Sequence, residues 1–271
     1  MFRSSGMPIV FGGASLAGIG ADLRARIDCR PPVSDGDLVR IAAANSRRPI
    51  LILDGLFSDS RALTPTECRD MLRNGWTVLG ASSMGALRAA DLWPEGMIGV
   101  GDVYLGLRTG LLRGDGEVAV ALNPFTFEEM TVTTVFLRAA AGGLLAAELA
   151  TATDARRIVH AAASVHFFDR TPEACNESWI AAGVDEPIRV AALAYLAVPR
   201  NNPKVRDARL ALGHLLATLW PMSHMGKPVT DTGLQCDLAP PGAVTCRACG
   251  NTLPSAAIFC AHCASTAHEE Q

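Results

Sequence analysis

Four short apolar segments, each followed by a polar or glycine-rich turn, constrain the fold of this 271-residue chain more than any other feature. The segments are rich in Ile, Val and Leu and have the length of buried strands. They are MPIVFGGAS (7–15), ARIDCRPPV (25–33), RPILILDGLF (48–57) and WTVLGASS (76–83). Helical stretches fit between them, with Asp or Thr at their starts. This alternation predicts an open, mostly parallel α/β sheet.

The chain divides by composition into four predicted regions. Residues 1–125 form the α/β core, and the Ala- and Leu-rich sequence over 126–221 predicts a helical region packed on it. Residues 222–245 contain three prolines and little periodicity, which predicts a linker. Residues 246–271 then form a separate small module.

Charge and hydropathy exclude several classes of protein. A net charge of -3 gives no electrostatic reason to bind nucleic acid. No uncharged apolar stretch reaches the roughly 18 residues that a membrane span needs. The apolar run near the N-terminus breaks at Gly12 and Gly13, which argues against a secretory signal. We therefore expect a cytoplasmic protein that does not enter membranes.

Four cysteines in the last module have the spacing of a zinc ribbon. They form two Cys-x-x-Cys pairs separated by ten residues: Cys246, Cys249, Cys260 and Cys263. Two such pairs can place four thiolates tetrahedrally around one zinc ion. Because four cysteines close the coordination shell to water, the predicted zinc is structural and not catalytic.

Ligands of open parallel sheets bind beyond the carboxyl ends of the strands, so the residues there are the candidate substrate contacts. They are Gly12, Gly13 and Ser15 after the first predicted strand, Asp54 after the third, and Ser82 and Ser83 after the fourth. Small residues let a substrate approach the backbone closely, although glycine-rich turns are also an ordinary way to leave a strand.

The turn Ala81-Ser82-Ser83-Met84-Gly85 has the spacing of a nucleophile elbow in which the first glycine is replaced by alanine. This spacing predicts Ser83 as the nucleophile and the backbone N–H of Met84 as an oxyanion donor. Ser82 is a competing nucleophile or a hydrogen-bonding neighbour. A turn built only for packing is the alternative on spacing alone.

Six segments of the chain resemble segments of the TfuA-like family, in the same order and at similar separations. They are VFGGASL (10–16), RPPVSDGDL (30–38), LILDGLF (51–57), GASSMGALRAADL (80–92), GMIGVGDVY (96–104) and GDGEVAVAL (114–122). TfuA-like proteins are partners of YcaO proteins in the thioamidation of ribosomal peptides or proteins. The resemblance implies that this chain hydrolyses a thiocarboxylated, ThiS-like sulfur-carrier protein to supply sulfide, and meets the peptide or protein substrate only indirectly.

The general base of such a reaction has few candidates in this sequence. The family's usual His-Lys-Glu stretch corresponds here to Pro65, Thr66 and Glu67. No lysine precedes Lys204 and no histidine precedes His160, so a carboxylate must serve unless a histidine folds back. The resemblance favours Glu67, followed by Asp54 and Glu117, and each of these is equally suited to a capping, turn-forming or solvated role.

Arg88 is the candidate that neutralises the anionic thiocarboxylate, with an ion pair to Asp91 as an equal alternative. Glu117 is a further candidate substrate contact. Three other functions remain open. They are a non-catalytic adaptor that recruits the carrier, the substrate or the YcaO protein, a serine hydrolase similar to Clp-type peptidases, and a nucleotide-binding enzyme.

Overall fold

The structure is a computed structural model that describes residues 6–44, 47–57, 62–219, 243–245 and 252–254. These residues form two compact units. The first runs up to Arg108 and resumes from Lys204 to Leu219, and the second runs from Thr109 to Pro203. Near the C-terminus, β6 (Ala243–Thr245) and β7 (Thr252–Pro254) form a two-stranded antiparallel pair.

Within the described residues, the sheet of the first unit has five parallel strands in the order β2-β1-β3-β4-β5. The strands are β1 (Ile9–Phe11), β2 (Asp28–Arg30), β3 (Ile50–Ile52), β4 (Val78–Gly80) and β5 (Ile98–Gly99). In register, Val10 of β1 pairs with Leu51 of β3, and Leu51 pairs with Leu79 of β4. The predicted parallel α/β sheet is confirmed, and β5 is an additional strand at its edge.

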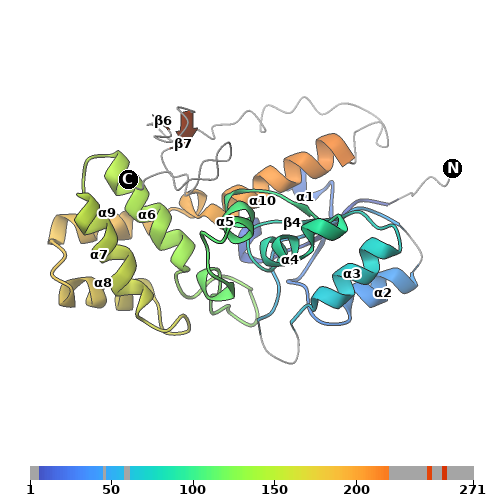
Figure 1. Ribbon diagram of the computed structural model, residues 1–271, viewed down its shortest axis with the longest axis horizontal. Helices are drawn as coiled ribbons and strands as arrows, with labels where there is room; N and C mark the ends of the chain where they lie inside the picture. Colours follow the sequence, from blue (N-terminus) through green and yellow to red (C-terminus); the bar gives the residue numbers. More distant parts are fainter. Residues whose placement is uncertain (1–5, 45–46, 58–61, 220–242, 246–251, 255–271) are drawn as a thin grey trace. The chain divides into compact units, whose positions relative to one another are not determined.

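Two apolar cores cover the two faces of the sheet because side chains alternate along each strand. The first and third residues of β1 and β3 face helices α2 (Asp37–Ala43), α3 (Pro65–Arg73) and α4 (Met84–Leu92). Helices α2 and α3 lie side by side there (Figure 1). The middle residues face the short turn η1 (Ala14–Leu16), the helix α1 (Ala21–Arg24) and the helix α10 (Pro203–His214).

Helix α10 belongs to the predicted helical region and packs on the sheet of the first unit. Leu212 lies in the same core as Val10. The carboxylate of Asp207 accepts hydrogen bonds from the N–H groups of Asp102 (3.1 Å) and Val103 (2.8 Å), at the start of α5 (Asp102–Thr109). Burial raises the pKa of Asp207 to about 8. The first unit is therefore completed by a segment far away in sequence.

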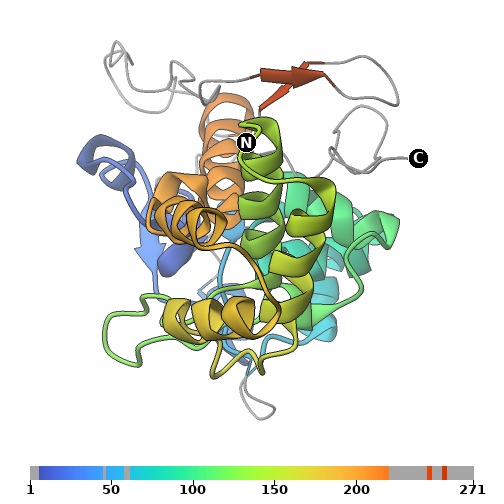
Figure 2. The same cartoon turned by 90° about the vertical axis from the view of Figure 1, so that its left-hand side faces the viewer.

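The second unit is helical, as predicted for this part of the chain. Its helices are α6 (Thr134–Ala146), α7 (Ala152–Ala163), α8 (Pro172–Ala181) and α9 (Glu186–Leu196), which pack against one another (Figure 2). Threonine side chains cap the starts of three of them, at Thr133, Thr151 and Thr171. No helix in the described ranges has the length and apolar character needed to cross a membrane.

Candidate active site

Asp54 follows β3 and lies at the carboxyl end of the sheet, between β1 and β3, where the strand order reverses. Its side chain is buried, and its Oδ2 accepts hydrogen bonds from the N–H groups of Gly13 (2.8 Å) and Ser15 (3.0 Å). Its Oδ1 accepts a hydrogen bond from Ser15 Oγ at 2.6 Å. We call Asp54, Gly13 and Ser15 the Asp54 cluster. Its carboxylate occupies the backbone donors that an anionic ligand would otherwise use.

The other predicted contact after β1 is also engaged in the fold. The N–H of Gly12 donates to the carbonyl of Arg30 at 3.0 Å, and a Cβ added to Gly12 would lie 2.8 Å from the Leu16 side chain. Within the first unit, the groups predicted to bind substrate after β1 therefore hold the η1 turn onto the sheet. Substrate contact by Gly12, Gly13 or Ser15, or proton transfer by Asp54, would require these contacts to open.

Two glycines set helix α4 against the sheet at the turn after β4. A Cβ on Gly85 would overlap the carbonyl oxygen of Ile52, and a Cβ on Gly80 would overlap the carbonyl oxygen of Gly85. Such close backbone approach is possible only for glycine. Residues 81–84 between them, which we call the β4 turn, are thereby fixed at the carboxyl edge of the sheet.

Ser82 is the residue of the β4 turn with a positive backbone φ. Its φ is +68°, a left-handed conformation that is uncommon for serine and marks strain in the turn. Its side chain is fully buried, and its Oγ donates a hydrogen bond to the carbonyl of Lys204 at 2.8 Å. Ser82 therefore provides the strained corner of the turn and ties it to α10, and its hydroxyl is already engaged.

Ser83 occupies the N-cap position of α4 but does not cap the helix. A serine there ordinarily accepts from the next free amides, but the Gly85 N–H donates to Leu53 and the Ala86 N–H donates to Ala81. The Ser83 hydroxyl and the Met84 N–H make no hydrogen bond within the described part of the chain. These are the two groups that the elbow spacing predicts for attack and for oxyanion binding.

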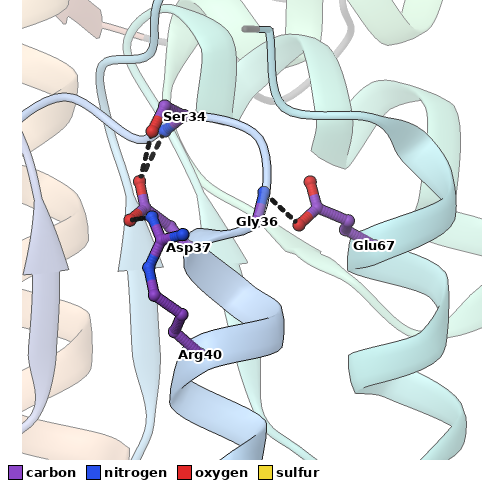
Figure 3. Close-up of polar contacts among 5 residues, drawn as sticks. All are labelled: Ser34, Gly36, Asp37, Arg40 and Glu67. Atoms are coloured by element: carbon purple, nitrogen blue, oxygen red, sulfur yellow. Dashed lines mark hydrogen bonds and ion pairs between the residues drawn. The ribbon is translucent and has the colours of Figure 1, made fainter.

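Glu67 lies in the first turn of α3, whose N-cap is Thr64. Glu67 as a residue is 9% exposed, and its Oε1 accepts a hydrogen bond from the Gly36 N–H at 2.8 Å (Figure 3). Its Oε2 is buried and has no hydrogen-bond partner among the described residues. Burial raises the pKa of Glu67, the Gly36 N–H lowers it, and the Asp35 carboxyl raises it further. The pKa of Glu67 thus lies above that of an ordinary glutamate, which suits a carboxyl group that accepts a proton and returns it.

Arg88 forms an ion pair with Asp91, which is one of the two roles that the sequence predicts for it. Its Nη1 lies 2.6 Å from Asp91 Oδ2, and its Nε donates to the carbonyl of Leu63 at 3.0 Å. Leu63 directly precedes the N-cap of α3, so Arg88 ties α4 to the start of the helix that carries Glu67. Binding of an anionic substrate by Arg88 would compete with Asp91.

The topology brings three predicted residues to one edge of the sheet. Ser83 and Met84 follow β4, and Glu67 lies in the first turn of α3, the helix that follows β3 in the chain. Since β3 and β4 are parallel neighbours, these positions lie at their shared carboxyl edge. An edge with an unused hydroxyl, an unused N–H and a buried carboxyl suits acyl transfer.

The remaining candidates lie in the second unit or outside the described residues. Glu117 forms an ion pair with Arg138 at 3.2 Å, within the second unit. The four predicted zinc ligands, Cys246, Cys249, Cys260 and Cys263, fall outside the described residues. Among the residues that the structure describes, no group of His, Cys, Asp and Glu is arranged to hold a metal ion.

One residue near this site was missed by the sequence analysis. Lys204 is 1% exposed, and its carbonyl accepts the Ser82 hydroxyl across 122 residues of sequence. Lys204 lies at the start of α10, and the pattern of a helix does not show which turn its first residues will contact. The hydrogen bond between Ser82 and Lys204 therefore could not be predicted from the sequence. It shows that the β4 turn is held in part by a distant segment.

Comparison with known proteins assigns a family resemblance to part of the chain. No curated protein was found to match it. Residues 54–171 match the family model described as TfuA-like protein, so two of the six resembling segments, VFGGASL and RPPVSDGDL, lie outside the matched range. The match covers a little under half of the chain and includes Glu67, Arg88, Glu117 and the β4 turn. This part of the chain is therefore similar to TfuA-like proteins.

Proposed function

We propose that this chain is an accessory enzyme of peptide or protein backbone thioamidation. It would hydrolyse a thiocarboxylated, ThiS-like sulfur-carrier protein and supply the sulfide to a YcaO-type partner. The observation that carries the proposal is the TfuA-like match over residues 54–171. Within that range the β4 turn leaves the Ser83 hydroxyl and the Met84 N–H without partners among the described residues, which supports acyl chemistry there.

In the proposed reaction the Ser83 oxygen attacks the terminal carbonyl carbon of the carrier. The Met84 N–H stabilises the negative charge that develops on the carbonyl oxygen. During the attack the serine proton passes to Glu67. The C–S bond then breaks with its electron pair on sulfur, and Glu67 gives the proton to the sulfur, which leaves as hydrosulfide. Water hydrolyses the acyl-serine and gives the carrier carboxylate and free Ser83. Arg88 is the proposed contact for the anionic thiocarboxylate, in exchange for Asp91.

A non-catalytic adaptor is the second candidate function, and one observation favours it. The residues Ser82 and Ser83 are 0% and 2% exposed, so the turn must open before a carrier C-terminus can reach Ser83. An adaptor would use the same edge, or the C-terminal module, only to bind the carrier, the substrate or the YcaO protein. A Ser83→Ala, Glu67→Ala double variant that retains full sulfide release would favour the adaptor.

The direct test offers purified protein a thiocarboxylated carrier and measures sulfide together with the intact mass of the carrier. The proposal predicts sulfide release and replacement of the carrier's thiocarboxylate by a carboxylate. An intact thiocarboxylate, both with and without a YcaO partner, would overturn the hydrolase assignment.

A structural zinc ion in the C-terminal module is part of the same proposal. Cys246, Cys249, Cys260 and Cys263 would bind it as thiolates, which is the donor set of structural zinc sites. Elemental analysis is expected to find one zinc ion per chain and to find none after Cys246→Ser and Cys249→Ser. Zinc retained at full stoichiometry in that variant would reject this ligand set.

A further inference from the structure

A loop of the second unit carries an aromatic side chain that the fold leaves uncovered. Phe125 is 90% exposed, whereas no other large apolar residue in the described part of the chain exceeds 61%. A side chain this exposed contacts little of the protein, so it adds little to the stability of the fold. Water contact with a phenyl ring is unfavourable, and a partner that covers the ring would relieve it. We call residues 121–130 the Phe125 loop.

The Phe125 loop is held in one conformation by its own hydrogen bonds. Its two sides meet in an antiparallel bridge between Leu122 and Glu129. At the tip, the Asn123 side-chain oxygen accepts hydrogen bonds from the N–H groups of Phe125 (2.9 Å) and Thr126 (3.1 Å). A side chain that binds the backbone two and three residues ahead stabilises a tight turn. The backbone of Phe125 is therefore fixed before any partner arrives.

The backbone of this loop is also strained. Phe127 has φ +57°, a left-handed conformation that is rare for a bulky aromatic residue, and its N–H donates to the carbonyl of Asn123 at 2.9 Å. Such strain persists only where the surrounding structure enforces it, and it is concentrated at functional sites. A strained residue lies two positions from an uncovered ring, so this loop has the features of a binding element.

The charges on the loop restrict the chemistry of its partner. Glu128 is exposed and forms no ion pair within the described ranges, although its Oε2 accepts a hydrogen bond from Thr126 Oγ1 at 3.1 Å. No lysine or arginine lies between Arg113 and Arg138 in the sequence. An apolar centre with an acidic edge is complementary to an apolar socket edged by Lys or Arg on another protein. An anionic lipid surface would repel the same edge.

We propose that the Phe125 loop is the docking anchor for the YcaO-type partner, and that Phe125 enters an apolar socket with basic edges on that protein. The identity of this partner rests on the proposed function. Every residue assigned to the proposed reaction belongs to the first unit, which leaves the second unit for the protein that receives the sulfide. Because the loop is already ordered, it loses little conformational entropy on binding.

Binding of the purified YcaO-type protein to the full-length chain, measured by calorimetry without any carrier, tests the anchor. Phe125→Ser should weaken the affinity by about 30-fold or more, as for a central interface residue. Asn123→Ala keeps the ring but removes two hydrogen bonds that hold the tip, so it should weaken the affinity less, by about 5-fold. Phe168→Ser, at an exposed position of the same unit, is the matched control and should bind as the wild type does.

Two further readouts separate docking from damage to the fold. Phe125→Ser should keep the urea unfolding midpoint of the wild type, because the ring is exposed, and should release sulfide from the carrier alone at the wild-type rate. Glu128→Lys should slow association with the YcaO-type protein about tenfold at low ionic strength and much less at high ionic strength.

Wild-type affinity in Phe125→Ser would overturn the anchor, and so would a wild type that does not bind the YcaO-type protein. A Phe125-dependent affinity for the thiocarboxylated carrier, or for phosphatidylcholine vesicles, in place of the YcaO-type protein would also overturn it, because the loop would then have another occupant. The binding measurement contains no carrier. Absence of sulfide release would therefore reject the hydrolase proposal without changing this result.

Discussion

The carboxyl edge of the sheet has two polar regions that differ in how completely their hydrogen bonds are satisfied. In the Asp54 cluster every donor that faces the carboxylate is engaged, and the carboxylate accepts three hydrogen bonds. Around β4, the Ser83 hydroxyl, the Met84 N–H and Glu67 Oε2 lack partners among the described residues. Buried polar groups are ordinarily paired, so each unpaired one requires an explanation, of which a bound water or ligand is one and a catalytic role is another.

This difference separates residues that hold the fold from residues that are available for chemistry. Sequence position alone ranks both regions equally, since each follows a strand and contains small polar residues. The comparison predicts that substitutions in the Asp54 cluster lower stability, whereas isosteric substitutions around β4 leave stability intact and remove activity.

The largest effect is expected where helix α4 touches the sheet. Gly85→Ala places a methyl group against the Ile52 carbonyl, which cannot move without disrupting the strands. The cost should exceed about 3 kcal/mol, measured by urea unfolding, or prevent soluble expression. Gly20→Ala is the matched control, because its φ of -61° suits alanine and no atom lies within 4 Å of the added carbon. Equal stability of the two variants would contradict the close approach described here.

The next effect is expected in the Asp54 cluster. Asp54→Ala leaves three buried donors, two N–H groups and the Ser15 hydroxyl, without an acceptor. The free energy of unfolding should fall by about 3 kcal/mol or more. Asp54→Asn should cost less, because its carbonyl can still accept the N–H groups while its amide donates to Ser15 Oγ. A stable Asp54→Ala variant would break the distinction between the two regions.

Glu67→Gln should have the smallest effect on stability and so sharpens the comparison. The glutamine carbonyl can accept the Gly36 N–H as Oε1 of Glu67 does, and the amide carries no charge to bury. Because the pKa of Glu67 is raised in the fold, its contribution to stability is present at low pH and is lost as the pH rises through that raised pKa. Urea unfolding should show Glu67→Gln at least as stable as the wild type at pH 8, with the two proteins converging near pH 4. A variant clearly less stable than the wild type at pH 8 would argue that ionised Glu67 stabilises the fold.

Strands β1, β3 and β4 could be predicted because each lies in a short apolar run rich in Ile, Val and Leu, whereas β2 is Asp28-Cys29-Arg30 and is only flanked by Ile27 and Val33. Strands β1 to β4 all lie within predicted segments. Strand β5 was missed because it is only Ile98–Gly99, with glycines too frequent around it to give a strand pattern. The helical region was predicted to pack on the core, but the sequence could not show that α10 is the helix that covers one face of the sheet, because amphipathic periodicity shows that a helix has a buried face but not which surface buries it.

The candidate site could be predicted only in part, for a similar reason. The elbow spacing identified Ser83 and the Met84 N–H, since spacing within a turn is a local property. It could not show that the positive φ belongs to Ser82, or that Asp54 meets Gly13 and Ser15 across some forty residues. Such long-range hydrogen bonds decide which polar groups are engaged, and they exist only once the fold is formed.

The central claim is that the β4 turn carries the chemistry through Ser83. The most direct measurement compares sulfide release from a thiocarboxylated carrier by the wild type, Ser83→Ala and Ser82→Ala. We expect Ser83→Ala to lose at least about 100-fold in kcat, as for removal of a covalent nucleophile. Ser82→Ala should keep most of its kcat and lose about 1 kcal/mol of stability with its hydrogen bond to Lys204. Release by Ser83→Ala at the wild-type rate would contradict the account.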